Sequence, residues 1–169
     1  MSNTKDLNHK EAINKLKSLV EEITICLFCT DLKTDDGSTC RPMSAINVCD
    51  EGNIWFFSEK NSDKNNAIIN DKNVQLIFSH PSKSSYLVVN GEAKIILDKT
   101  KIEELWTPMA KIWFKEGKDD PNISVIKVTP TTAYYWDTEG KRMTNFIRMV
   151  ASVITGTNFL NEEEGTITL

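Results

Sequence analysis

The sequence predicts a mainly β protein, in which a closed antiparallel β-barrel carries a few peripheral helices. Short runs rich in β-branched and aromatic residues recur along the chain and are separated by polar turns. Helical segments do not alternate regularly with these runs, so the crossover helices of a parallel sheet are missing. No polar linker divides the chain, and we therefore expect residues 1–169 to form one domain.

The N-terminal third is predicted to contain one helix and three strands. Apolar residues recur at helical spacing over residues 9–22, which predicts an amphipathic helix. The polar segment 33–38 predicts a flexible loop between the first two strands. The strands themselves are expected near residues 23–31, 40–49 and 53–58.

The middle of the chain is predicted to contain a short helix and two strands. The helix is expected at about 62–70, and the strands follow near 73–79 and 85–97. The dipeptide Asn90-Gly91 interrupts the second of these strands. Because glycine gives a strand no side chain to pack, this dipeptide predicts either a β-bulge or a sharp bend.

The remaining chain is predicted to contain two helices and three short strands. Residues 100–116 place their large apolar side chains on one side of a helix, which Pro108 breaks or kinks because proline cannot donate the backbone hydrogen bond. A second helix is expected over residues 142–154. Strands are expected at residues 123–128, 133–136 and 166–169.

Composition excludes several classes of function. The formal net charge of −4 and the pI near 5.3 argue against general nucleic-acid binding, which needs a positive surface for the phosphate backbone. No apolar run reaches the length of about 20 residues that spans a bilayer. The polar N-terminus lacks the apolar core of a secretion signal, so we expect a cytoplasmic protein.

The cysteines form a CxxC pattern that does not predict a metal or redox site. Cys26 and Cys29 lie in a strand-like run, where residues three apart face opposite sides. A zinc pair needs both sulfur atoms to converge. We therefore expect all four cysteines, including Cys40 and Cys49, to be reduced thiols. His9 and His80 are too few for a multi-histidine metal site.

The common catalytic and nucleotide-binding motifs are missing from the sequence. It contains no GxGxxG, no GxxxxGK[ST] and no HExxH. No nucleophile stands out together with a nearby base. An enzyme with this sequence would therefore take its chemistry from a cofactor.

A phosphate site is predicted between residues 41 and 64. Lys64 lies in the first turn of a predicted helix, whose N-terminus offers free N–H groups and a favourable dipole to an anion. Ser62 could cap that helix or bond a phosphate oxygen directly. Arg41 could form charge-assisted hydrogen bonds to a phosphate or a ribityl chain. Taken singly, Arg41 is more typical of a surface ion-pair partner and Lys64 of a solvated helix residue.

A flat ring slot is predicted in the same stretch of sequence. Met43, Phe57 and Ser58 lie on strands that could offer an apolar surface with backbone donors at its edge, as an isoalloxazine ring requires. Phe56 and Phe57 are adjacent on an alternating strand. One of them should face the core, and the other should contact a ligand, a helix or another subunit.

Together these motifs resemble the general stress protein 26 family, within the pyridoxamine 5′-phosphate oxidase-like split-barrel flavoproteins. The resemblance covers nearly the whole chain. It rests on Arg41-Pro42-Met43, Ile54-Trp55-Phe56-Phe57-Ser58 with Ser62 and Lys64, Val74-Gln75-Leu76-Ile77-Phe78, Val89-Asn90-Gly91-Glu92-Ala93, Leu105-Trp106, Trp113-Phe114, Asp120-Pro121-Asn122 and Tyr135-Trp136-Asp137.

The resemblance implies a split barrel that binds FMN, with FAD as an alternative, at a homodimer interface. Lys64 would contact the phosphate, and Tyr86 stands where the oxidases have a flavin-contacting glutamine. Trp106 and Trp113 would either cover the site from the partner subunit or pack within their own kinked helix. The positions implied along the ring and ribityl chain are Arg41, Pro42, Met43, Ser44, Phe57 and Ser58.

Two departures from the family pattern bear on the reaction. Ile46 stands where the vitamin B6 oxidases have a substrate-binding lysine, and Asp63 replaces a basic residue beside Lys64. We therefore expect an FMN-binding general stress protein that acts as a flavin-dependent oxidoreductase but does not oxidise vitamin B6. The alternative is a non-catalytic module that binds or buffers flavin. A haem-handling protein is less favoured, because only His9 and His80 could ligate iron.

Overall fold

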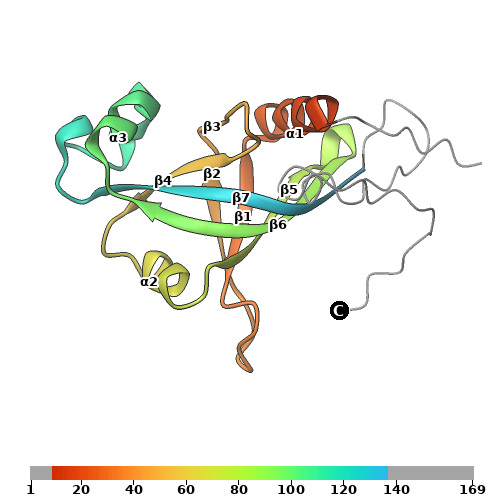
Figure 1. Ribbon diagram of the computed structural model, residues 1–169, viewed down its shortest axis with the longest axis horizontal. Coiled ribbons are helices and arrows are strands. Elements are labelled where there is room, and N and C mark those ends of the chain that lie inside the picture. The colour runs from red at the N-terminus through yellow and green to blue at the C-terminus, as the bar shows by residue number, and fades with distance from the viewer. Residues whose placement is uncertain (1–8, 137–169) are drawn as a thin grey trace, which may run out of the picture.

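The computed structural model describes residues 9–136 (Figure 1). The predicted helix at 142–154 and the predicted strand at 166–169 lie outside the described residues. No helix in the described part is long and apolar enough to cross a membrane. In chain order the elements are α1 (His9–Ile23), β1 (Ile25–Thr30), β2 (Thr39–Ser44), β3 (Asn47–Val48), β4 (Ile54–Glu59), α2 (Asp63–Asn70), β5 (Asn73–His80), η1 (Pro81–Lys83), β6 (Ser85–Ile96), α3 (Lys99–Leu105), η2 (Pro108–Ile112), η3 (Gly117–Asp119) and β7 (Ile123–Trp136).

Seven strands form one curled sheet in the order β2-β1-β5-β6-β7-β4-β3. Every neighbouring pair is antiparallel. Figure 1 shows α1 and α2 on opposite sides of this half-barrel, with the β1–β2 loop projecting away from it. The predicted mainly β, antiparallel architecture is therefore confirmed.

The two edge strands of the sheet are joined by a two-residue bend. β2 pairs with β1, whereas β3 pairs with β4. Between them, Ala45 N–H donates to the carbonyl oxygen of Thr24 at 2.9 Å, and Ile46 N–H donates to that of Trp55 at 2.8 Å. The single strand predicted over residues 40–49 was therefore wrong, because the chain changes pairing partner at this bend.

The main hydrophobic core fills the inside of the curl. Phe28 and Phe56 meet edge to face with their ring centroids 5.2 Å apart, and Phe78 is fully buried with them. Leu16 of α1 and Ile68 of α2 pack into the same core from the two helices. Burying a side chain of this size stabilises the fold by about 1.5–3 kcal/mol. The amphipathic helix predicted over residues 9–22 is confirmed.

A second hydrophobic cluster lies on the other face of β4 and β7. It contains Trp55, Ile102 and Phe114, with Phe57 and Trp106 packed against it. Adjacent residues of a strand face opposite sides. Accordingly, β4 buries Phe56 in the main core and directs Phe57 into this second cluster. The segment predicted as a helix over 100–116 is broken, since α3 ends before Pro108 and η2 begins there.

Strand β7 is one continuous strand, although two were predicted at 123–128 and 133–136. The register with β6 shifts between Asn90 and Gly91, which pair with Thr132 and Pro130. Thr131 is the extra residue, and its hydroxyl donates to the carbonyl oxygen of Asn90 at 3.1 Å. Of the two interpretations of this dipeptide, the β-bulge is the one observed. The bulge keeps the strand continuous past the proline.

Cys29 and Cys40 form a disulfide, so the expectation of four reduced thiols was wrong. The two cysteines are directly opposite each other in β1 and β2, with their Cα atoms 4.0 Å apart. Alternation along the strand did hold, because Cys26 faces the core instead. Burial there raises the pKa of the Cys26 thiol to about 12.

Replacing Gly91 with alanine should destabilise the fold. A Cβ atom at this position would lie 2.6 Å from the carbonyl oxygen of Thr129 and 3.1 Å from Cα of Pro130. Both are backbone atoms that cannot move aside, so we expect a loss of about 1–3 kcal/mol in the free energy of unfolding, measured in urea. Lys94→Ala, on an exposed position of the same strand, is the matched control. Equal stability of the two variants would contradict the tight contact.

Candidate functional site

The two cations of the predicted phosphate site are near enough to interact electrostatically. The Arg41 guanidinium donates through Nη1 to Thr30 Oγ1 at 3.3 Å, on the inner face of β2. Burial, followed by the charge of Arg41, lowers the pKa of Lys64 below its ordinary value, and Glu59 opposes this shift. Lys64 Nζ also donates to Ser62 Oγ at 3.4 Å. We call the two cations Arg41 and Lys64, together with the neighbouring Ser62, the cation cluster.

Ser62 caps the N-terminus of α2. Its hydroxyl accepts the backbone N–H of Asn65 at 3.3 Å, which is the capping interaction that the sequence predicted as one of two roles. Ser62 Oγ also lies 3.4 Å from Ser58 Oγ. Lys64 therefore lies in the first turn of a capped helix, whose dipole favours an anion at its N-terminus.

A buried polar network fixes the position of α2 against the sheet. Ser58 Oγ donates to Asn65 Oδ1 at 2.7 Å, and Asn65 Nδ2 donates to Ser124 Oγ at 3.0 Å. Ser124 Oγ in turn donates to the carbonyl oxygen of Ser58 at 2.9 Å. Sequence reasoning missed Asn65 and Ser124, because nothing in their local pattern marks them as buried. Only the docking of α2 against β4 and β7 brings these side chains together.

The aromatic residues of the predicted ring slot gather outside the barrel. The ring centroid of Phe57 lies 5.8 Å from that of Trp106 and 6.1 Å from that of Phe114. Phe57 therefore contacts the α3–η2 segment, which was one of the three partners left open. Trp106 is half-buried in this cluster, whereas Trp113 is 60% exposed. Only Trp113 leaves most of its surface available to another molecule.

The other predicted ring residues are divided between the two faces of β2. Met43 packs against the inner core, on the same face as Arg41. Pro42 and Ser44 alternate with them and are exposed on the outer face. Tyr86 of β6 is also exposed on the sheet. The structure thus brings Arg41, Ser62 and Lys64 together, but it does not gather all eleven predicted residues into one pocket of a single chain. Their roles toward a flavin remain predictions.

A row of apolar side chains crosses the outer face of the sheet. The strand registers place Leu27 opposite both Pro42 and Ile77, Ile77 opposite Val88, and Val88 opposite Tyr134. We call these five residues the outer apolar row. Leu27 is 45% exposed, and its neighbour Ile25 is 59% exposed. Such a contiguous apolar surface is typical of an interaction site.

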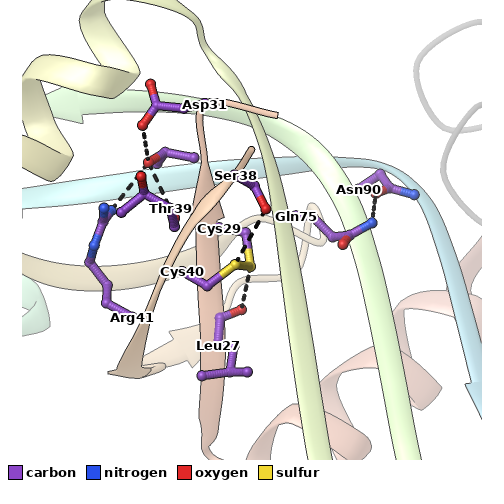
Figure 2. Close-up of a disulfide and its surroundings, with 10 residues drawn as sticks. Leu27, Cys29, Asp31, Ser38, Thr39, Cys40, Arg41, Gln75 and Asn90 are labelled. Atoms are coloured by element: carbon purple, nitrogen blue, oxygen red, sulfur yellow. Dashed lines mark hydrogen bonds between the residues drawn. A yellow bond between two sulfur atoms is a disulfide. The ribbon is translucent and has the colours of Figure 1, made fainter. Parts of the chain in front are cut away.

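A polar row runs beside the outer apolar row. Gln75 Nε2 donates to Asn90 Oδ1 at 2.9 Å, and Asn90 Nδ2 donates to Thr132 Oγ1 at 3.1 Å. Figure 2 shows the first of these bonds next to the Cys29–Cys40 disulfide. The disulfide therefore lies on the outer face, at the polar margin of the outer apolar row.

A hollow of about 280 Å³ lies near the start of α2, but it is unsuited to a phosphate. Its lining includes the carboxylates of Glu59 and Asp120, together with the exposed Trp113, and it includes neither Arg41 nor Lys64. Like charges would repel a phosphate there. All three residues of the cation cluster are half-buried.

Comparisons with known proteins agree with this fold. The family model described as "Pyridoxamine 5′-phosphate oxidase like" matches residues 11–160. A protein of Clostridium acetobutylicum related to general stress protein 26 superposes with a TM-score of 0.70 at 19% identity, over 87% of this chain and 99% of its own. That likeness shows the fold, a split barrel.

Three further relatives are similar in sequence as well. General stress protein 26 of Bacillus anthracis shares 25% identity at a TM-score of 0.64, over 76% of this chain and 94% of its own. The general stress FMN/FAD binding protein of Xanthomonas citri shares 25% identity at a TM-score of 0.65, over 78% of this chain and 92% of its own. Protein bli-3 of Neurospora crassa is 25% identical over 157 residues, which are 86% of this chain and 74% of that protein. Because the family model matches most of the chain, the chain belongs to the pyridoxamine 5′-phosphate oxidase-like family.

Proposed function

We propose that this protein binds FMN and holds its phosphate in the cation cluster. The observation that carries the proposal is the proximity of Arg41 and Lys64. Burial first, and the like charge of Arg41 second, lower the pKa of Lys64 and so disfavour its charged form. An anion bound between them would reverse that effect and gain charge-assisted hydrogen bonds. The FMN/FAD-binding description of the Xanthomonas citri relative supports a flavin as the ligand.

FMN suits the cation cluster better than FAD does. The terminal phosphate of FMN carries between one and two negative charges at neutral pH, and it offers three oxygens to the cluster. Lys64, Arg41 and the N-terminus of α2 together supply a matching positive site. In FAD the corresponding phosphate is esterified to a second phosphate and adenosine, so it offers the cluster fewer free oxygens and less charge than the terminal phosphate of FMN.

The bound flavin would supply hydride or electron transfer, and the chain would position it. Ile46 packs against the second hydrophobic cluster, so it places no cation where the vitamin B6 oxidases hold their substrate. We infer a flavin-dependent oxidoreductase with a substrate other than a B6 phosphate ester. The alternative, a non-catalytic flavin-binding module, differs in one observable: it would not turn over with NADH or NADPH and an electron acceptor.

The outer apolar row is proposed to pack against a second copy of this chain. Leu27 of β1 and Pro42 of β2 are exposed in this row, and its other three side chains are half-buried. Pro42, Ser44 and Tyr86 point out of the barrel and cannot complete a ring slot within one chain. A second copy against this face would supply the missing wall, as the family resemblance implies. The flavin would then lie at a homodimer interface.

Lys64→Ala should weaken the binding of FMN much more than that of riboflavin, which lacks the phosphate. Loss of a hydrogen bond to a charged group costs about 1.5–3 kcal/mol, so we expect the dissociation constant for FMN to rise about tenfold or more. Quenching of flavin fluorescence on titration measures both ligands. Lys60→Ala, an exposed lysine on the loop before α2, is the matched control and should bind both ligands normally. An equal loss for FMN and riboflavin in Lys64→Ala would show that Lys64 does not serve the phosphate.

FMN affinity should also fall at alkaline pH earlier than an ordinary lysine predicts. Burial and Arg41 hold the pKa of Lys64 below 10.5, so in the free protein its ammonium group loses the proton as the pH rises through that lowered value. Below it Lys64 is charged and binding is strong; above it the attraction is lost. The same fluorescence titration, repeated from neutral pH to pH 10.5, measures the decline. Lys64→Arg, whose guanidinium stays protonated, should remove the decline. Identical profiles for the two proteins would contradict the role of Lys64.

Leu27→Arg should dissociate the proposed dimer. Leu27 lies in the outer apolar row between Pro42 and Ile77, so a charge there would be buried without a partner in the assembly. We expect a monomer in sedimentation equilibrium, with weakened FMN binding. Ile69→Arg is the matched control, because Ile69 is 72% exposed on α2 and does not belong to the row. A Leu27→Arg protein that remains dimeric would place the interface elsewhere.

A further inference from the structure

We propose that Cys29 and Cys40 are a reversible thiol–disulfide couple that controls the order of β2 and, through Arg41, the affinity of the cation cluster. The bond joins two residues that face each other across β1 and β2. Arg41 is the next residue along β2 (Figure 2). The consequence for flavin affinity rests on the proposed function, whereas the redox couple itself does not.

The two sulfur atoms differ in their accessibility. Cys40 is exposed, whereas Cys29 is only 1% exposed. Ser38 Oγ lies 3.7 Å from Cys40 Sγ, and the residues of the loop before it are exposed as well. A small thiol can therefore reach Cys40 Sγ from the side of the polar loop. Exposed disulfides of this kind are the ones that reducing agents open.

Thiol–disulfide exchange at Cys40 balances with a low-molecular-weight thiol as reductant. Its thiolate attacks Cys40 Sγ, the bond between the two protein sulfurs breaks, and Cys29 leaves as a thiolate that takes up a proton. A second thiolate then attacks the outer sulfur of the mixed disulfide and releases Cys40, which is protonated in turn. Two electrons and two protons thus pass from two small thiols to the protein, and a small-molecule disulfide is formed. The same small-molecule disulfide drives the reverse reaction.

The other cysteines leave this couple isolated. Cys26 faces the core, and burial raises its pKa to about 12, so it supplies almost no thiolate. Cys49 is half-buried beyond the end of β3, where Asn53 Nδ2 donates to its sulfur at 3.6 Å. Neither cysteine is bonded to another. Within the described residues, the disulfide is therefore the Cys29–Cys40 bond alone.

The link to Arg41 follows from the position of β2 at the edge of the sheet. β2 pairs only with β1, so the disulfide is the one covalent tie across that pairing in the described chain. On the opposite face of the same strands, Thr30 Oγ1 accepts Arg41 Nη1 and donates to Asp31 Oδ2 at 3.0 Å. Reduction would leave this end of β2 held by hydrogen bonds alone. Arg41 would then spend less time in the cation cluster.

The first experiment measures the couple without any flavin. The full-length protein is equilibrated in glutathione buffers of graded potential, and free thiols are counted by alkylation and mass spectrometry. In the wild type we expect two additional thiols to appear together as the buffer becomes more reducing. In Cys29→Ser/Cys40→Ser the number of thiols should not change. Amide hydrogen exchange should become faster over residues 39–44 in the reduced protein and stay unchanged in β4. A bond that persists in the most reducing buffer, or unchanged exchange over 39–44, would overturn the proposal.

The second experiment measures FMN and riboflavin binding to the two redox forms. We expect FMN to bind about five- to tenfold more weakly to the reduced protein, as for the weakening of one charge-assisted hydrogen bond, with riboflavin little affected. Cys29→Ser/Cys40→Ser should bind like the reduced form under all conditions, and Cys49→Ser should keep the wild-type response. Equal FMN affinity of the two forms would overturn the link to the cation cluster. Failure of both forms to bind FMN would refute the proposed function, while thiol counting and exchange still decide on the couple.

Discussion

The bend at Ala45 and Ile46 holds the half-barrel together. Two backbone hydrogen bonds, to Thr24 on one side and Trp55 on the other, tie the two edges of a seven-stranded sheet to one short segment of chain. This short segment links the two edge strands around the core that contains Phe28 and Phe56. The same bend places β2 at an edge, so Arg41 depends on the pairing of a single strand with β1.

Alternation along β1 and β2 then gives the two faces of these strands different surroundings. The inner face carries Arg41 and Met43 toward the barrel, where α2 brings Lys64 close. The outer face carries the outer apolar row and the disulfide. In our proposal the flavin site uses both faces and needs a second chain, whereas its phosphate site needs only one. The buried network of Ser58, Asn65 and Ser124 fixes the position of α2 against β4 and β7.

Local patterns predicted most elements of the fold, and long-range register accounts for what they missed. The spacing of apolar residues predicted α1, and Pro108 marked the end of a helix. By contrast, the pairing of Cys29 with Cys40 depends on the β1–β2 register, which the CxxC spacing does not predict. Residues 40–49 read as one strand because a change of pairing partner leaves no mark in a hydrophobic run. The two cations of the cation cluster were predicted from the sequence to serve one phosphate site, whereas the network of Asn65 and Ser124 that fixes α2 was not.

The central claim is that the phosphate of FMN binds between Arg41 and Lys64, and a crystal structure of the protein with FMN tests it most directly. We expect the phosphate within hydrogen-bonding distance of both cations and of the N-terminus of α2. We also expect the ring against the outer face of β2 and a second copy of the chain. A phosphate bound elsewhere, for example among Lys60, Lys99 and Lys118, would contradict the account.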